Sequence, residues 1–156
     1  MAVDEKATLS AFLDWYRDAA LRKVEGLDRE ALTRRLVPSL TNLLGIVKHL
    51  AYVERSWFRM TFRGESVTRP RTAADPGAEF RVGEDEGTAE IIALYRDEIE
   101  HARAIVAAAG LNDHAAREDR RDYTLRWIMV HMIEETARHV GHADILREQI
   151  DGATGE

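Results

Sequence analysis

Three polar side chains interrupt an otherwise apolar helical face near the end of the sequence. Alternating steps of three and four residues follow this face along the chain: Leu125, Ile128, Met132, Glu135, His139, His142 and Leu146. A carboxylate in a core is costly unless it is paired or coordinated, so Glu135 requires a partner. Glu135 and His139 are about 40° apart around the helix and about 6 Å apart along it, a spacing at which two side chains can bind one ion.

Two further histidines flank this pair on the same predicted helix. His142 lies roughly 10 Å along the axis from Glu135, too far for both to bind one ion directly. We therefore expect His142 to support a ligand or to contact the substrate. His131 precedes Glu135 by four residues on the side away from His139. It is the alternative ligand, and we expect it to border the site or a helix interface.

A third candidate ligand, His49, lies at the edge of an apolar stripe that includes Ile46, Leu50 and Val53. Two imidazoles and one carboxylate leave coordination positions open for water or substrate, as catalytic metal sites require. Spacing alone leaves two simpler interpretations open. A core histidine is often held by hydrogen bonds alone, and a buried arginine can balance a carboxylate in a helical seam.

Other side chains with similar chemistry fit structural roles. Glu134 and Arg138 are four residues apart on a neighbouring face, which predicts an exposed ion pair. The remaining residues are interpreted as surface histidines or as aromatic core packing: His101 and His114 in the first group, Trp57, Phe58 and Trp127 in the second.

The elements that must position these residues are four long helices. Helical apolar spacing predicts an all-α fold with helices over residues 5–25, 40–62, 88–109 and 124–149, and a short turn over 28–36. The inward stripe of the first helix is expected to comprise Leu9, Phe12, Leu13, Tyr16 and Leu21. Trp15 and Tyr16 are adjacent and cannot both face one core, which predicts a homodimer.

A long connection separates the second and third predicted helices. Residues 64–87 contain Pro, Gly and charge without periodicity. A connection of this length can cross a bundle, so we expect a four-helix bundle in up-down-down-up order with the second and third helices parallel. The 156 residues fall in the usual range of one domain, which we predict to extend over 1–156.

Composition excludes several classes of partner and chemistry. The formal net charge of −6 disfavours nucleic-acid binding. The start MAVDEKATLS is unlike a signal peptide and no stretch is apolar enough for a membrane span, so we expect a cytoplasmic protein. The absence of cysteine removes disulfides, thiolate ligands and a cysteine nucleophile. A reacting thiol would have to be a substrate.

Two motifs together resemble the DinB-like metalloenzyme superfamily, in its actinobacterial mini-circle protein branch. They are HLAYVERSWF from His49 and HMIEETARHVGHADILRE from His131, and the resemblance extends over nearly the whole chain. It implies a four-helix bundle with a divalent metal held by one ligand from the second helix and two from the last. Many members use three histidines, whereas mycothiol-dependent maleylpyruvate isomerases, which are similar, use a His, Glu, His zinc set. The resemblance thus implies His49, Glu135 and His139 as ligands.

The resemblance also implies a function. Similar superfamily members are S-transferases for low-molecular-weight thiols, so we expect a metal-dependent transfer of a mycothiol-like thiol to a small electrophile. Zn is the expected metal, with Ni, Fe and Mn as alternatives. His142 and His131 are expected to orient the thiol or to move a proton. The alternatives are a metal-dependent hydrolase that uses the same site and a non-catalytic, metal-stabilised dimeric interaction module.

Overall fold

Helices account for the regular structure of the computed structural model, which describes residues 4–155. In chain order these are α1 (Glu5–Arg22), α2 (Arg29–Thr33), α3 (Leu43–Glu54), the π-helix η1 (Arg55–Phe62), α4 (Thr88–Ala108), the 3-10 helix η2 (Glu118–Arg120) and α5 (Leu125–Asp151). No strand occurs within the described range. The predicted all-α class is therefore confirmed. None of the described helices is long and apolar enough to cross a membrane.

Polar side chains set where several helices begin. Asp4 accepts a hydrogen bond from the backbone N–H of Ala7 at the start of α1, and Thr124 accepts one from that of Trp127 at the start of α5. Asn42 does the same for Gly45 at 2.8 Å. Because such a capping residue has extended backbone, α3 begins at Leu43, after the predicted start at residue 40.

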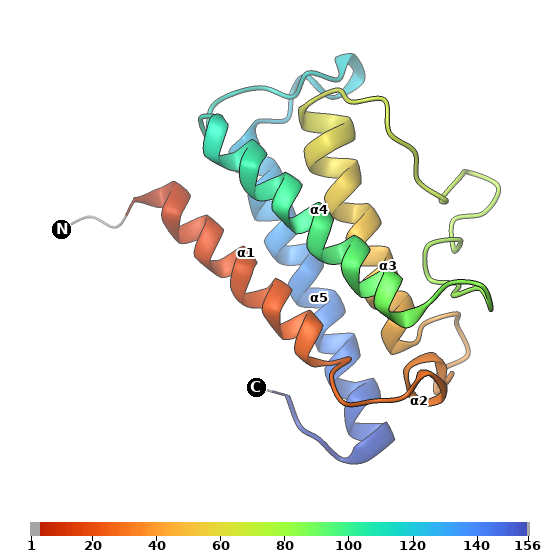
Figure 1. The fold of residues 1–156 in the computed structure, drawn as a ribbon. Helices are drawn as coiled ribbons and strands as arrows, with labels where there is room; N and C mark the ends of the chain where they lie inside the picture. Colours follow the sequence, from red (N-terminus) through yellow and green to blue (C-terminus); the bar gives the residue numbers. More distant parts are fainter. Residues whose placement is uncertain (1–3, 156) are drawn as a thin grey trace.

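The long connection runs back along the bundle, as predicted. In Figure 1 it leaves the end of η1 at the top and descends, in yellow-green, to the start of α4 at the bottom. As a result, α3 and α4 run parallel to each other, and α1 and α5 run in the opposite direction. The predicted up-down-down-up order is confirmed. The main packing pairs are α1 with α5 and α3 with α4.

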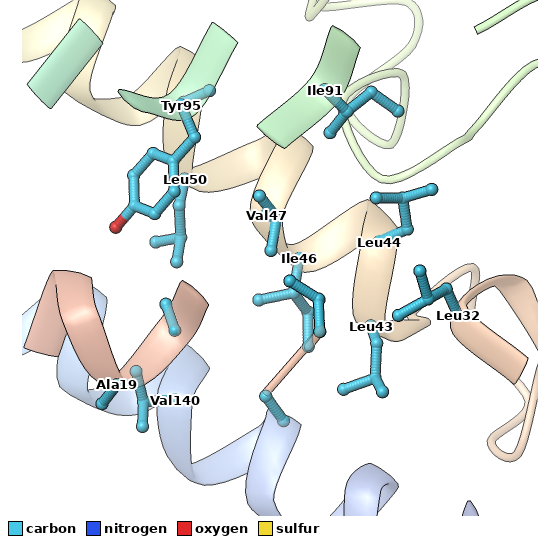
Figure 2. Close-up of a cluster of buried hydrophobic side chains, with 14 of the residues drawn as sticks. Ala19, Leu32, Leu43, Leu44, Ile46, Val47, Leu50, Ile91, Tyr95 and Val140 are labelled. Carbon is cyan, nitrogen blue, oxygen red and sulfur yellow. The ribbon is translucent and has the colours of Figure 1, made fainter. Parts of the chain in front are cut away.

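The core consists of two apolar clusters at different heights of the bundle. One gathers around the first half of α3 and includes Leu44, Leu50, Tyr95 and Val140 (Figure 2). The other includes Phe58, Leu125, Ile128, Met129 and Met132. Helix α5 contributes to both, and the stretch from Glu135 to His139 lies between its two contributions. A polar layer thus separates two apolar ones.

The inward face of α1 differs from the predicted stripe. Leu13 is buried, but Phe12 is 56% exposed, so the prediction that Phe12 faces the core is wrong. Arg17, four residues after Leu13, takes the next core position and makes two 2.7 Å hydrogen bonds to the buried Glu54 of α3. Since Phe12 is one residue before Leu13, a rotation of about 100° carries it outward.

Candidate metal centre

Three side chains from two helices converge in the polar layer. His49 comes from α3, and Glu135 and His139 come from α5. Glu135 Oε1 lies 3.3 Å from Nε2 of His49 and 3.3 Å from Nε2 of His139. One ligand atom from each residue lies within 4.8 Å of the other two. Both histidines are buried, at 4% and 9% exposure.

A second carboxylate holds His49 from behind. Glu79, which is fully buried on the long connection, has an oxygen 3.2 Å from Nδ1 of His49. Arg69 donates two hydrogen bonds to the same carboxylate, at 2.6 and 2.7 Å. The ring of His49 also stacks on Phe80, with ring centres 4.1 Å apart. The connection therefore fixes the ring so that Nε2 faces Glu135.

Histidine and arginine neighbours keep Glu135 and Glu79 in their charged form. Hydrogen bonding to His139, and then to His49, lowers the pKa of Glu135 far below its usual range. Burial opposes ionisation of Glu79, but hydrogen bonds from His49 and Arg69 outweigh it and lower the pKa. Burial likewise disfavours the charged form of His49, yet its bonds to Glu135 and Glu79 raise the pKa. Two negative charges thus flank His49, in surroundings that favour a cation.

The donor set fits a divalent metal ion. Two ligand atoms about 2.1 Å from a tetrahedral ion are about 3.4 Å apart, close to the N···O separations found here. Nδ1 of His139 is buried without a hydrogen-bond partner among the described residues, so within that range no hydrogen bond fixes this ring in the way that Glu79 fixes His49. The buried Arg17 balances Glu54 and the half-buried Arg69 balances Glu79, whereas the contacts of Glu135 are with two imidazoles. A site made of two histidines and one carboxylate binds a divalent metal ion better than it binds an arginine side chain.

The candidate centre opens into a pocket. His49 and Glu135 form part of the lining of a cavity of about 440 Å³, which also includes His131. The other flanking histidine, His142, is exposed and lines a different pocket with Val37 and Ile145. Its ring centre is 5.5 Å from that of His139. The two predicted auxiliary histidines are therefore on different pockets of the molecule.

Comparison with known proteins identifies the family. A sequence model described as mycothiol S-transferase matches residues 8–152. The chain belongs to the mycothiol S-transferase family. This membership bears out the predicted DinB-like relationship and supports a thiol S-transferase-like function.

Solved structures agree with the fold of this mycothiol S-transferase family member. The crystal structure of a conserved protein from Enterococcus faecalis is similar with a TM-score of 0.67, and the match covers 97% of this chain and 100% of that one. The two sequences are 13% identical, so this likeness concerns the fold alone. A search of the curated proteins finds no match.

Aromatic side chains surround His131 at the side of the pocket. Its ring lies 4.6 Å from Trp57 and stacks on Trp127 at 5.2 Å. Phe58 is fully buried, as predicted, but Trp127 is 42% exposed, so its predicted core role is wrong. Trp57 is partly buried against the second core cluster, as predicted, and it also lines the pocket, as do Ser56 and Thr61 of η1.

The remaining sequence predictions concern the surface. Glu134 and Arg138 form the predicted ion pair, and their side chains are 49% and 59% exposed. His101 and His114 are exposed, and each has Nδ1 within hydrogen-bond distance of a backbone carbonyl. These positions agree with the predictions.

Glu79 and Arg69 were missed because they lie in a segment without periodicity. Glu79 is 30 residues from His49 in sequence, and no repeating pattern links the two. The only local signal is the adjacent Phe80, an aromatic residue in an otherwise polar stretch. Such a residue marks where a connection packs against the core, but it does not identify the carboxylate's partner.

Proposed function

We propose that this protein is a metal-dependent S-transferase that conjugates mycothiol to a small electrophile. The observation that carries the proposal is the convergence of His49, Glu135 and His139 beside an open pocket in a chain without cysteine. The family match supports the thiol. A chain without a thiol of its own must take the nucleophilic sulfur from a substrate.

His49, Glu135 and His139 would hold the metal, with Zn as the first candidate and Ni, Fe or Mn as alternatives. A divalent ion there would lower the pKa of a bound thiol from about 8.5, so that thiolate is available at neutral pH. Glu79 contributes by keeping the ring of His49 in place. The charged carboxylates of Glu135 and Glu79 would offset the positive charge of the metal ion.

Within the pocket, His131 is positioned to handle the proton and orient the thiol. Its ring is held between Trp57 and Trp127, and its Nδ1 is 3.7 Å from Glu134. The sulfur forms a bond to the electrophilic carbon, and the leaving group departs with the bonding electron pair. The thiol proton passes to His131 or to water. We assign His142 a supporting role through its contact with His139.

The test is a conjugation assay on metal-loaded and chelator-treated protein. With mycothiol and a soft electrophile, we expect the metal-loaded protein to accelerate conjugation and chelation to abolish the acceleration. Glutathione, bacillithiol and coenzyme A should react more slowly if the pocket selects the thiol by shape. His49→Ala should match the chelated protein.

Two outcomes would replace the proposal. If the metal-loaded protein conjugates none of these thiols but cleaves an ester or an amide, the same site serves hydrolysis. If it does neither, a non-catalytic interaction module is the better description. The opening of the candidate centre into a pocket favours catalysis over that module.

A further inference from the structure

Four arginines line both the pocket beside the candidate metal centre and its neighbour. Arg69 and Arg71 come from the long connection, and Arg117 and Arg120 come from the segment around η2. The inner pocket, of about 440 Å³, contains His49 and Glu135. The outer pocket, of about 700 Å³, extends toward Thr72 and Pro76 of the connection. The shared arginines lie where the two pockets meet.

This concentration of positive charge is local, since the whole chain carries a formal charge of −6. Ion pairs with neighbouring carboxylates neutralise part of this positive charge. Arg69 is held by Glu79, and Arg117 makes hydrogen bonds of 2.7 and 3.1 Å to Asp119. Arg120 is 3.9 Å from the same Asp119 and 3.2 Å from the hydroxyl of Tyr123.

Arg71 and Arg120 retain donors for a ligand. Arg71 is exposed and makes no ion pair with any residue between 4 and 155. The closest carboxylate to Arg120 already accepts two hydrogen bonds from Arg117. A guanidinium offers five N–H donors in a planar fork that matches a carboxylate. Arginine therefore selects a planar anion more strongly than a neutral group.

The position of the arginines, between the inner and the outer pocket, indicates which substrate they contact. The thiol must reach His49 and Glu135 at the inner end of the pocket if the proposed function holds, because the candidate metal ligands are there. The electrophile then approaches the sulfur from the outer pocket, past the arginines.

We propose that the electrophile is a small carboxylate, held by Arg71 and Arg120 with its reacting carbon toward the candidate metal centre. This inference rests on the proposed function and names the substrate class. Iodoacetate is a suitable probe because its amide, iodoacetamide, undergoes the same reaction without the charge. In both cases the sulfur–carbon bond forms, the carbon–iodine bond breaks, iodide leaves with the bonding pair and the thiol proton goes to solvent.

The kinetic experiment compares kcat/KM for the two reagents with mycothiol and the metal-loaded full chain. The ratio of iodoacetate to iodoacetamide should exceed the ratio of the uncatalysed reactions by at least about tenfold, as hydrogen bonds to a charged group imply. The Arg71→Gln/Arg120→Gln variant should return the ratio to the uncatalysed value. Arg121→Gln is the matched control, since Arg121 is adjacent in sequence but lines neither pocket. It should keep the wild-type ratio.

A binding experiment separates this inference from the proposed function. Equilibrium dialysis without thiol should show that radiolabelled succinate binds wild type and Arg121→Gln at least about tenfold more tightly than the double variant. Conjugation of both reagents without a charge preference, together with equal succinate binding by all three proteins, would overturn the carboxylate assignment and leave the transferase intact. Arginine-dependent succinate binding with no conjugation of either reagent would instead remove the transferase, and with it the anionic electrophile.

Discussion

Glu134 and Glu135 are adjacent in sequence but have opposite surroundings. Glu135 is bracketed by His49 and His139, whereas Glu134 pairs with Arg138 at the surface. We expect Glu135→Ala to lose the metal, because two remaining ligands are too few for tight binding. Glu134→Ala should retain it. Elemental analysis of the purified variants measures the difference, and equal metal content in both would contradict the assignment.

At the residue scale, Glu79 provides a second prediction. Its hydrogen bond orients His49, and loss of such a supporting carboxylate lowers metal affinity by about 10–100-fold in known sites. Glu79→Ala should therefore bind metal more weakly while still binding it, as measured by competition with a chelator. Asp75→Ala is the control: Asp75 is on the same connection but pairs with the exposed Arg81. If both variants bind equally, the support from Glu79 is not functional.

At the scale of the elements, the contact between α3 and the long connection depends on Gly45. A Cβ at this position would lie 2.3 Å from the backbone oxygen of Phe80, which cannot move without displacing the connection. Gly45→Ala should lower the free energy of unfolding by about 1–3 kcal/mol, as overpacking does. Because Glu79 and Phe80 both contact His49, metal affinity should fall as well. Chemical denaturation and chelator competition measure the two effects.

Gly141 is the matched control for that substitution. It lies in the interior of α5, and a Cβ there would meet nothing within 4 Å. Gly141→Ala should raise the free energy of unfolding by about 0.5–1 kcal/mol, since alanine favours the helix. If Gly141→Ala loses stability, or if Gly45→Ala loses none, the close approach to the Phe80 backbone does not explain the effect of a methyl group at position 45.

At the scale of the whole molecule, an exposed aromatic patch on α1 supports the predicted homodimer. Ala11, Phe12, Trp15 and Tyr16 line one surface pocket, and Trp15 is 67% exposed. Burying a large apolar side chain stabilises an interface by about 1.5–3 kcal/mol. We expect sedimentation to show a dimer for wild type and a monomer for Trp15→Glu. A 17.7 kDa monomer of the wild type at micromolar concentration would rule out the dimer.

Local periodicity was enough to predict the helices and the phase of the polar seam. The step of 3.6 residues per turn places Glu135 and His139 on one face of α5 and Glu134 on another, and the structure agrees. The parallel arrangement of α3 and α4 followed from the length of one connection. These features depend on spacing within a single segment, which a sequence displays directly.

Contacts between distant segments depended on packing that no local pattern encodes. The pairing of His49 with Glu79, the gathering of four arginines from two irregular segments and the separation of His131 from His142 all required the folded chain. The outward position of Phe12 is of the same kind, because Arg17 occupies a core-facing position on α1 and its two hydrogen bonds to Glu54 offset the cost of burying both charges. Helical spacing determines which residues share a face, but the neighbour that the face meets is determined by the tertiary fold.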